Sequence, residues 1–204
     1  MPFTEMSPLT AAIMVACVVS FVAARFLPAD FERQLMLQPF YILRENRWYQ
    51  LLTSGFMHAS LLHLGVNMLT LYFFGPVIEQ SMGTLNYAGL YFFSLIMSGI
   101  PSIIRHRANP CFATLGASGA VGGVVFAFIM FFPTRSLYLF LIPIPIPAIV
   151  FGVLFLIYSF VESKRARGKV NHDAHLAGSL AGILYVMVAV PRYFEHLLTL
   201  LGLL

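Results

Sequence analysis

Charged side chains are scarce in this sequence of 204 residues: only 10% are Asp, Glu, Lys or Arg, whereas 59% are hydrophobic. An ordinary soluble domain is about 25% charged. A chain with this composition and a mean hydropathy of +0.85 cannot cover a water-facing surface. We therefore expect an all-α membrane protein that crosses the bilayer several times.

Other absences narrow the function further. The sequence has no basic stripe interleaved with aromatic residues, so nucleic acid is not an expected partner despite a net charge of +4. Its two cysteines, Cys17 and Cys111, lie in an apolar run and a polar connector, and we do not expect them to pair. The first apolar run lacks a basic front region and an A-x-A site, which favours a retained helix over a removed signal peptide. No repeat, low-complexity tract or second domain is found, so we expect one domain over residues 1–204.

Six apolar runs have lengths near the roughly 17–25 residues that a membrane helix needs. The predicted helices are 9–26, 61–77, 87–104, 116–132, 147–160 and 175–190. The proline-broken segment LYLFLIPIPIP before the fifth run is expected to be extended, because proline lacks the N–H that a helix interior needs. The connector between the first two runs mixes charges, aromatics and leucines, which indicates a folded segment at the membrane interface.

Polar residues within these runs fall at one end of the bundle. Successive helices alternate in direction, so the second, fourth and sixth begin on the same side of the membrane. His63 and Asn67 lie in the first turns of the second helix, four residues apart and hence on one face. Ser118 opens the fourth helix and His175 the sixth. Polar groups in lipid are costly and mark functional sites, so we expect these four to meet at one depth.

Glycines accompany the serine and the second histidine on their helices. Small residues allow two membrane helices to approach closely, which would bring the Ser118 hydroxyl within reach of the His175 imidazole. The glycines are Gly119, Gly122 and Gly123 on one helix and Gly178 and Gly182 on the other.

A serine beside a histidine has a chemical meaning. Serine is a weak nucleophile until an adjacent base removes its proton, and the same base can return the proton to a leaving amine. The resulting oxyanion needs donors, for which Asn67, His63 and the backbone N–H of Ser118 are candidates. Asp173 is only two residues from His175 and would point elsewhere on a helix, so we expect a Ser–His dyad and not a triad.

Two other interpretations stay open. The serine and its glycines could serve helix packing alone. Alternatively, four histidines could bind a metal ion, although the sequence has no H-E-x-x-H motif and no carboxylate beside the pair on the second helix. Those histidines are His58, His63, His172 and His175.

The motifs resemble those of the rhomboid intramembrane serine proteases over nearly the whole chain. HASLLHLGVN (58–67) resembles the family's H-x4-H-x3-N, GASG (116–119) its G-x-S-G, and AHLAGSLAG (174–182) its A-H-x2-G-x3-G. GPVIE (75–79) is also similar to the family's G-x3-E. The order and helix positions of the three main motifs make the resemblance specific.

The resemblance implies a compact six-transmembrane-helix bundle with a water-filled site. It implies a serine endopeptidase that cleaves in or near transmembrane segments of other membrane proteins, with membrane lipids around it and no metal or cofactor. Ser118 would be the nucleophile and His175 the general base, with the oxyanion bound by His63, Asn67 and the Ser118 N–H. The helix 147–160 and the loop after it would move to admit substrate. Supporting positions would be Gly116, Gly119, Gly178, Gly182 and His58.

Two positions depart from the family pattern. The connector usually carries Trp-Arg about nine residues before the first motif histidine, where this chain has Tyr49 and Gln50. An aromatic residue often lies four positions after the serine and stacks on the base, where this chain has Gly122. An inactive relative that binds membrane helices without cutting them is therefore a third interpretation.

The distribution of basic residues and the family resemblance predict opposite orientations in the membrane. The positive-inside rule would place the catalytic side in the cytoplasm, because that side carries ten of the twelve basic residues. The resemblance implies the opposite, with cytoplasmic termini and an outward-facing site in a plasma membrane, or an inner membrane if bacterial, and this is the arrangement we predict. The ten are Arg25, Arg33, Arg44, Arg47, Arg105, Arg107, Lys164, Arg165, Arg167 and Lys169, against Arg135 and Arg192.

Overall fold

The computed structural model of the chain describes residues 7–26, 28–139, 142–165, 170–190 and 198–199. This part of the chain is mostly helical, with one short antiparallel hairpin. The elements are α1 (Pro8–Ala23), α2 (Ala29–Leu35), α3 (Pro39–Glu45), α4 (Gln50–Thr53), the 3-10 turn η2 (Ser54–Phe56), α5 (Leu61–Met82), α6 (Thr84–His106), α7 (Ser118–Phe131), β1 (Ser136–Leu139), β2 (Ile142–Pro147), α8 (Ala148–Arg165) and α9 (His172–Ala189).

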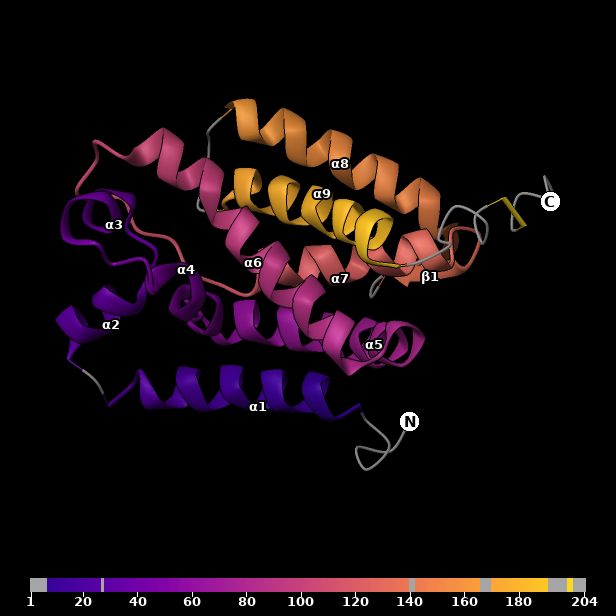
Figure 1. Cartoon of the computed structure of the whole chain (residues 1–204), viewed down its shortest axis with the longest axis horizontal. Helices are drawn as coiled ribbons and strands as arrows, with labels where there is room; N and C mark the ends of the chain where they lie inside the picture. The colour runs from indigo at the N-terminus through magenta and orange to yellow at the C-terminus, as the bar shows by residue number, and fades with distance from the viewer. Residues whose placement is uncertain (1–6, 27, 140–141, 166–169, 191–197, 200–204) are drawn as a thin grey trace.

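Each of the six predicted runs is represented by one helix, α1 and α5 to α9. Figure 1 shows α7 and α9 in the middle of the bundle, with α1 at one edge and α8 at the other. Several predicted boundaries differ from the structure by a few residues: α8, for example, ends at Arg165 and not at residue 160. Two of the differences have a visible local reason. Helix α9 begins at His172, before the predicted start, because the side chain of Asn171 accepts a hydrogen bond from the Ala174 N–H and caps the helix.

Helix α5 likewise runs five residues past its predicted end at Val77, through Pro76 and the buried Glu79. The carboxylate of Glu79 accepts hydrogen bonds from the backbone N–H groups of Leu9 and Thr10 at the start of α1, at 3.0 and 2.8 Å. It thereby satisfies N–H groups that the first turn of a helix leaves without partners. Glu79, the acidic residue of the GPVIE motif, thus joins two helices.

The connector between α1 and α5 is folded, as predicted, and Gln50 organises it. The Gln50 side chain is fully buried, donates to the carbonyl of Gln34 at 2.8 Å and accepts from the Gln38 N–H at 3.0 Å. Leu37 and Thr114 exchange backbone hydrogen bonds of 2.9 and 3.0 Å. The connector is therefore attached directly to the segment that precedes Ser118.

The proline-rich segment is extended, as predicted, and it forms strand β2, which pairs with β1. This pairing was not predicted, because proline removes backbone donors and is confined to sheet edges. Helix α8 then begins at Ala148, one residue after the predicted start. Three basic residues of the orientation argument, Arg167, Lys169 and Arg192, lie outside the described part of the chain.

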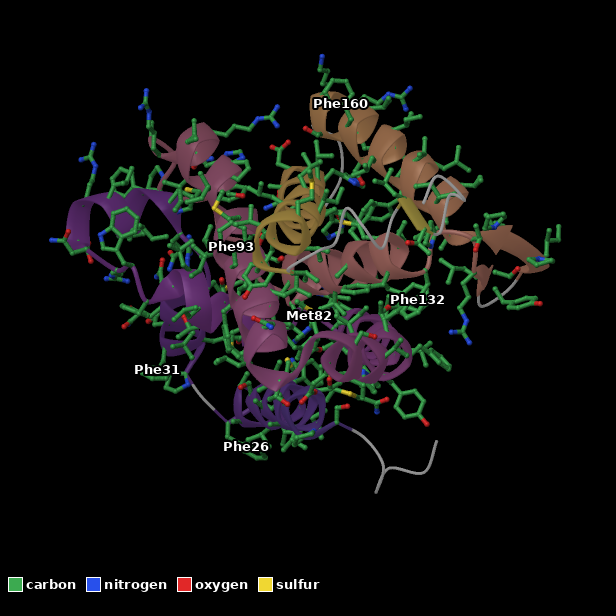
Figure 2. The ribbon with its side chains drawn as sticks, turned by 45° about the vertical axis from the view of Figure 1, so that its right-hand side comes forward. Phe26, Phe31, Met82, Phe93, Phe132 and Phe160 are labelled. Atoms are coloured by element: carbon green, nitrogen blue, oxygen red, sulfur yellow. The ribbon has the colours of Figure 1, made fainter. Side chains whose placement is uncertain are left out.

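Much of the outer surface is apolar. Two of the described helices, α5 and α6, are long and apolar enough to cross a membrane, while α1 and α7 are apolar but shorter. Large hydrophobic side chains such as Phe26 and Phe160 lie at the outside of the molecule in Figure 2 and are 84% and 49% exposed. Apolar patches of this kind on an outer surface indicate contact with another protein or a membrane.

Candidate active site

Ser118 and His175 lie in contact. The Oγ of Ser118, the first residue of α7, is 2.8 Å from the Nε2 of His175 in the first turn of α9. This is a normal hydrogen-bond distance between side chains that are 57 residues apart in the chain. The imidazole can accept the hydroxyl proton in the tautomer that carries its own proton on Nδ1.

Glycine makes this contact possible. A Cβ atom built on Gly178 would lie closer than 3.0 Å to the backbone carbonyl of Gly119, and one on Gly182 would lie equally close to the carbonyl of Gly123. Real Cβ atoms do not approach other atoms so closely. The predicted glycine-lined contact of the two helices is therefore present, with Gly119 and Gly123 at its closest points.

Helix α6 lies against the same two glycines of α7. A Cβ on Gly119 would overlap the side chain of Ser98, and a Cβ on Gly123 would overlap that of Ser94. Gly122 lies to one side, where an added Cβ would be 3.0 Å from the Oγ of Ser179. Three helices therefore converge on a row of small residues that directly follows Ser118 in α7.

His63 lies beside the segment that leads into Ser118. Gly116 has φ +128°, a conformation that only glycine adopts readily, and a Cβ there would be 2.6 Å from the Cε1 of His63. The side chain of Asn67 is buried, and its Nδ2 donates to the carbonyl of His63 at 2.9 Å. Ser118 itself is at the N-terminus of α7, where backbone N–H groups are free to bind an anion.

The ring of His58 packs against the ring of His63. It is 3% exposed, and its ring meets that of His63 edge to face with centroids 5.1 Å apart. Its Nδ1 is 3.3 Å from the carbonyl of Phe56. Burial and the neighbouring His63 lower the pKa of His58 to about 4, so the ring is neutral at physiological pH. These contacts place His58 against His63, and the supporting role of His58 stays a prediction.

The sequence did not reveal what surrounds the base. The ring of Phe155 in α8 lies nearly parallel to that of His175, and Tyr158 of the same helix meets His172 edge to face. Asp173 pairs with Arg105 of α6 at 2.5 Å and does not orient His175. The sequence contains one indication of these aromatic partners. Glycine at position 122 leaves no aromatic ring on the serine helix, which indicates that another residue must hold the His175 imidazole.

Metal coordination has no ligand set in the described part of the chain. Within residues 7–26, 28–139, 142–165 and 170–190, no group of three or more His, Cys, Asp or Glu side chains is arranged to hold a metal ion. The histidines instead form two pairs, His58 with His63 and His172 with His175.

Gly178→Ala tests the close helix contact. The added methyl group should push α9 away from α7 and destabilise the protein by about 1–3 kcal/mol, the usual cost of overpacking. Thermal unfolding in detergent measures this loss. Gly65→Ala is the matched control, because nothing lies within 4 Å of a Cβ at that position of α5. Equal melting temperatures for the two variants would contradict the proposed role of Gly178.

Comparison with known proteins agrees with this geometry. The rhomboid domain family matches residues 45–192. Rhomboid protein 1, mitochondrial, of Saccharomyces cerevisiae is 31% identical over 160 residues, which cover 76% of this chain and 44% of the yeast protein. RHOMBOID-like protein 12, mitochondrial, of Arabidopsis thaliana is 28% identical over 183 residues, covering 80% of this chain and 54% of that protein.

A bacterial protein is similar to a comparable extent. The putative rhomboid protease YdcA of Bacillus subtilis is 27% identical over 149 residues, which cover 72% of this chain and 70% of the Bacillus protein. The chain spans about half the length of the two mitochondrial relatives. Because the domain match extends over more than half of the chain, this protein belongs to the rhomboid family and has the polytopic membrane fold that the family implies.

Proposed function

We propose that the protein is an intramembrane serine endopeptidase that cleaves peptide bonds in or near transmembrane segments of other membrane proteins. The observation that carries this proposal is the 2.8 Å distance between the Oγ of Ser118 and the Nε2 of His175. Family membership supports it, since a relative from Bacillus subtilis is named a putative rhomboid protease.

The reaction follows from this pair. His175 accepts the proton of Ser118 as the oxygen attacks the scissile carbonyl, and the carbonyl becomes a tetrahedral oxyanion. The imidazolium then gives its proton to the leaving amine as the C–N bond breaks, leaving an acyl-enzyme. Water, deprotonated by the same imidazole, attacks the ester and regenerates Ser118. No carboxylate among the described residues is hydrogen-bonded to His175, so the base works as a member of a dyad.

Three donors are proposed to bind the oxyanion: the backbone N–H of Ser118, the ring of His63 and the amide of Asn67. Support comes from the position of the His63 ring against Gly116, two residues before the nucleophile. Asn67 uses one N–H on the carbonyl of His63, and an amide nitrogen carries a second hydrogen that remains for the substrate. Such donors act where the negative charge develops in the transition state.

We further propose that α1 and α5 to α9 form a compact bundle of six membrane-spanning helices. The two shorter apolar helices, α1 and α7, fit this arrangement if their ends lie below the membrane surface. We propose cytoplasmic termini, with the N-terminal ends of α5, α7 and α9, where the Ser–His pair lies, facing the opposite side. The names of the plant and yeast relatives place those proteins in mitochondria or chloroplasts.

Fluorophosphonate labelling of the purified protein tests the dyad. We expect the wild type to be labelled and to cleave a reporter transmembrane substrate, with both activities surviving a chelator. Ser118→Ala and His175→Ala should each abolish fluorophosphonate labelling and substrate cleavage, while the melting temperature stays that of the wild type. Ser81→Ala, on the exposed surface of α5, is the matched control and should be labelled normally.

The same measurement separates the alternatives. A wild-type protein that is folded but neither labelled nor active would favour an inactive relative that binds membrane helices. Stoichiometric zinc in an unlabelled protein would favour a metal site built from the histidines.

Asn67→Ala tests the oxyanion donors. Loss of one such donor typically lowers kcat by about 100- to 1,000-fold, and KM should change little because the oxyanion exists only in the transition state. Steady-state kinetics on the reporter substrate measure the two constants. A rise in KM at constant kcat would instead identify Asn67 as a substrate contact.

The native Cys111 tests the orientation. It is exposed in the loop between α6 and α7, on the side where Ser118 lies, whereas Cys17 is buried. If the site faces outward, a membrane-impermeant maleimide should label Cys111 in intact spheroplasts of the expression host, and Cys111→Ser should abolish the signal. Labelling that appears only after the inner face is opened would reverse the proposed orientation.

A further inference from the structure

The His175 imidazole has an aromatic ring of a neighbouring helix beside it. The ring of Phe155, from α8, lies with its centroid 6.5 Å from that of His175 and with an angle of 25° between the planes. This separation is within the range over which aromatic rings pack. The two rings come from different helices, so their alignment depends on how α8 sits against α9.

Phe155 is itself positioned by the helix that carries the nucleophile. Its ring centroid is 5.9 Å from that of Phe126 in α7, a side chain that is only 3% exposed. Phe151, one turn earlier in α8, adds a second ring at 6.0 Å. A row of aromatic rings therefore leads from the interior of the serine helix to the base.

A polar network fixes the other end of α8. The Oγ of Ser163, near the C-terminus of α8, donates to a carboxylate oxygen of Asp173 in the first turn of α9. Arg105, at the end of α6, donates to the other carboxylate oxygen at 2.5 Å and to the carbonyl of Ser163 at 3.2 Å. The three groups join the ends of α6 and α8 to the turn that presents His175.

The base needs such support. The only described hydrogen bond of the His175 ring is the one to Ser118, and no carboxylate among the described residues holds its other nitrogen. Gly122 offers no side chain on the serine helix. A ring with one hydrogen bond can still turn about its Cβ–Cγ bond, and packing on its face is what limits that rotation.

We propose that Phe155 is a positioning residue for the general base, and that the Arg105–Asp173–Ser163 network keeps α8 in the place from which Phe155 acts. This inference rests on the proposed protease function. It explains how the chain retains an aligned imidazole with glycine at position 122. Among the residues of α8, Ala148, Gly152 and Ser159 are buried, so few contacts hold this helix against the bundle. Its position therefore depends on contacts at its end, such as the hydrogen bonds of Ser163.

The test compares Phe155→Leu with Phe155→Tyr. Leucine keeps an apolar side chain but loses the ring, so the rate constant of fluorophosphonate labelling and kcat should both fall by roughly 10- to 100-fold, as a misaligned catalytic group does. KM and the melting temperature should stay near the wild-type values. Tyrosine restores the ring and should restore the rate.

Two further variants complete the design. Phe160→Leu makes the same change on the exposed outer surface of α8, where Figure 2 shows the side chain, and should leave the labelling rate unchanged. Asp173→Asn weakens the network and should lower the rate in the same direction as Phe155→Leu.

The outcomes separate this inference from the proposed function. If the wild type reacts with the fluorophosphonate and Phe155→Leu reacts as fast or faster, Phe155 does not position the base, although the dyad stands. A fall in labelling that matches a fall in the folded fraction, with no rescue by tyrosine, would also overturn the positioning role. An unreactive wild type would instead contradict the proposed protease function itself.

Discussion

The close approach of two backbones is the constraint on which the rest of the molecule depends. Where α7 crosses α9, the carbonyl groups of Gly119 and Gly123 occupy the space that a side chain on Gly178 or Gly182 would need. Lipid provides no hydrophobic drive for helices to associate, so close packing of small residues must supply the attraction. The distance between the Ser118 hydroxyl and the His175 imidazole is a consequence of this crossing, because Ser118 directly precedes Gly119 and His175 lies about one turn before Gly178. Ser94 and Ser98 of α6 lie against Gly123 and Gly119 and extend the same packing to a third helix.

Several polar side chains elsewhere in the bundle have hydrogen-bond partners that serve the fold. The carboxylate of Glu79 accepts hydrogen bonds from the first turn of α1, and the side-chain amide of Gln50 is hydrogen-bonded to two backbone groups of the connector. The amide of Asn171 caps α9 and donates to the hydroxyl of Ser102. An unpaired polar group in an apolar interior costs free energy, so each of these pairs serves stability. The pair formed by Ser118 and His175 differs because its members are the proposed nucleophile and base, at the N-terminal ends of two helices.

Much of the helix order and the central contact could be predicted from the sequence, and the reasons are local. Apolar length predicts a membrane helix, and glycine spacing predicts which helices can touch. The surroundings of His175 could not be predicted, because they depend on how α8 is rotated against α9. The nearly uniform apolar sequence of α8 does not specify that rotation. Phe155 looks like any other lipid-facing aromatic residue until the helix is placed. For Gln50 the sequence showed a departure from the family pattern, but only the folded connector shows that its amide bonds the buried N–H of Gln38 and the carbonyl of Gln34.

The two members of the pair are therefore held by different kinds of contact. The position of Ser118 is set by backbone packing at glycines, which tolerates no added atom and leaves little freedom. The orientation of His175 is set by a ring on α8, a helix that buries few side chains. Ser163 attaches the end of α8 by hydrogen bonds to both members of the Arg105–Asp173 ion pair, which itself joins α6 to α9. Because the ion pair lies at the exposed end of the helices, its strength depends on solvent and salt, whereas the glycine contact does not. A change that shifts α8 can thus alter the alignment of the base while the serine stays in place, which makes reactivity separable from the stability of the bundle.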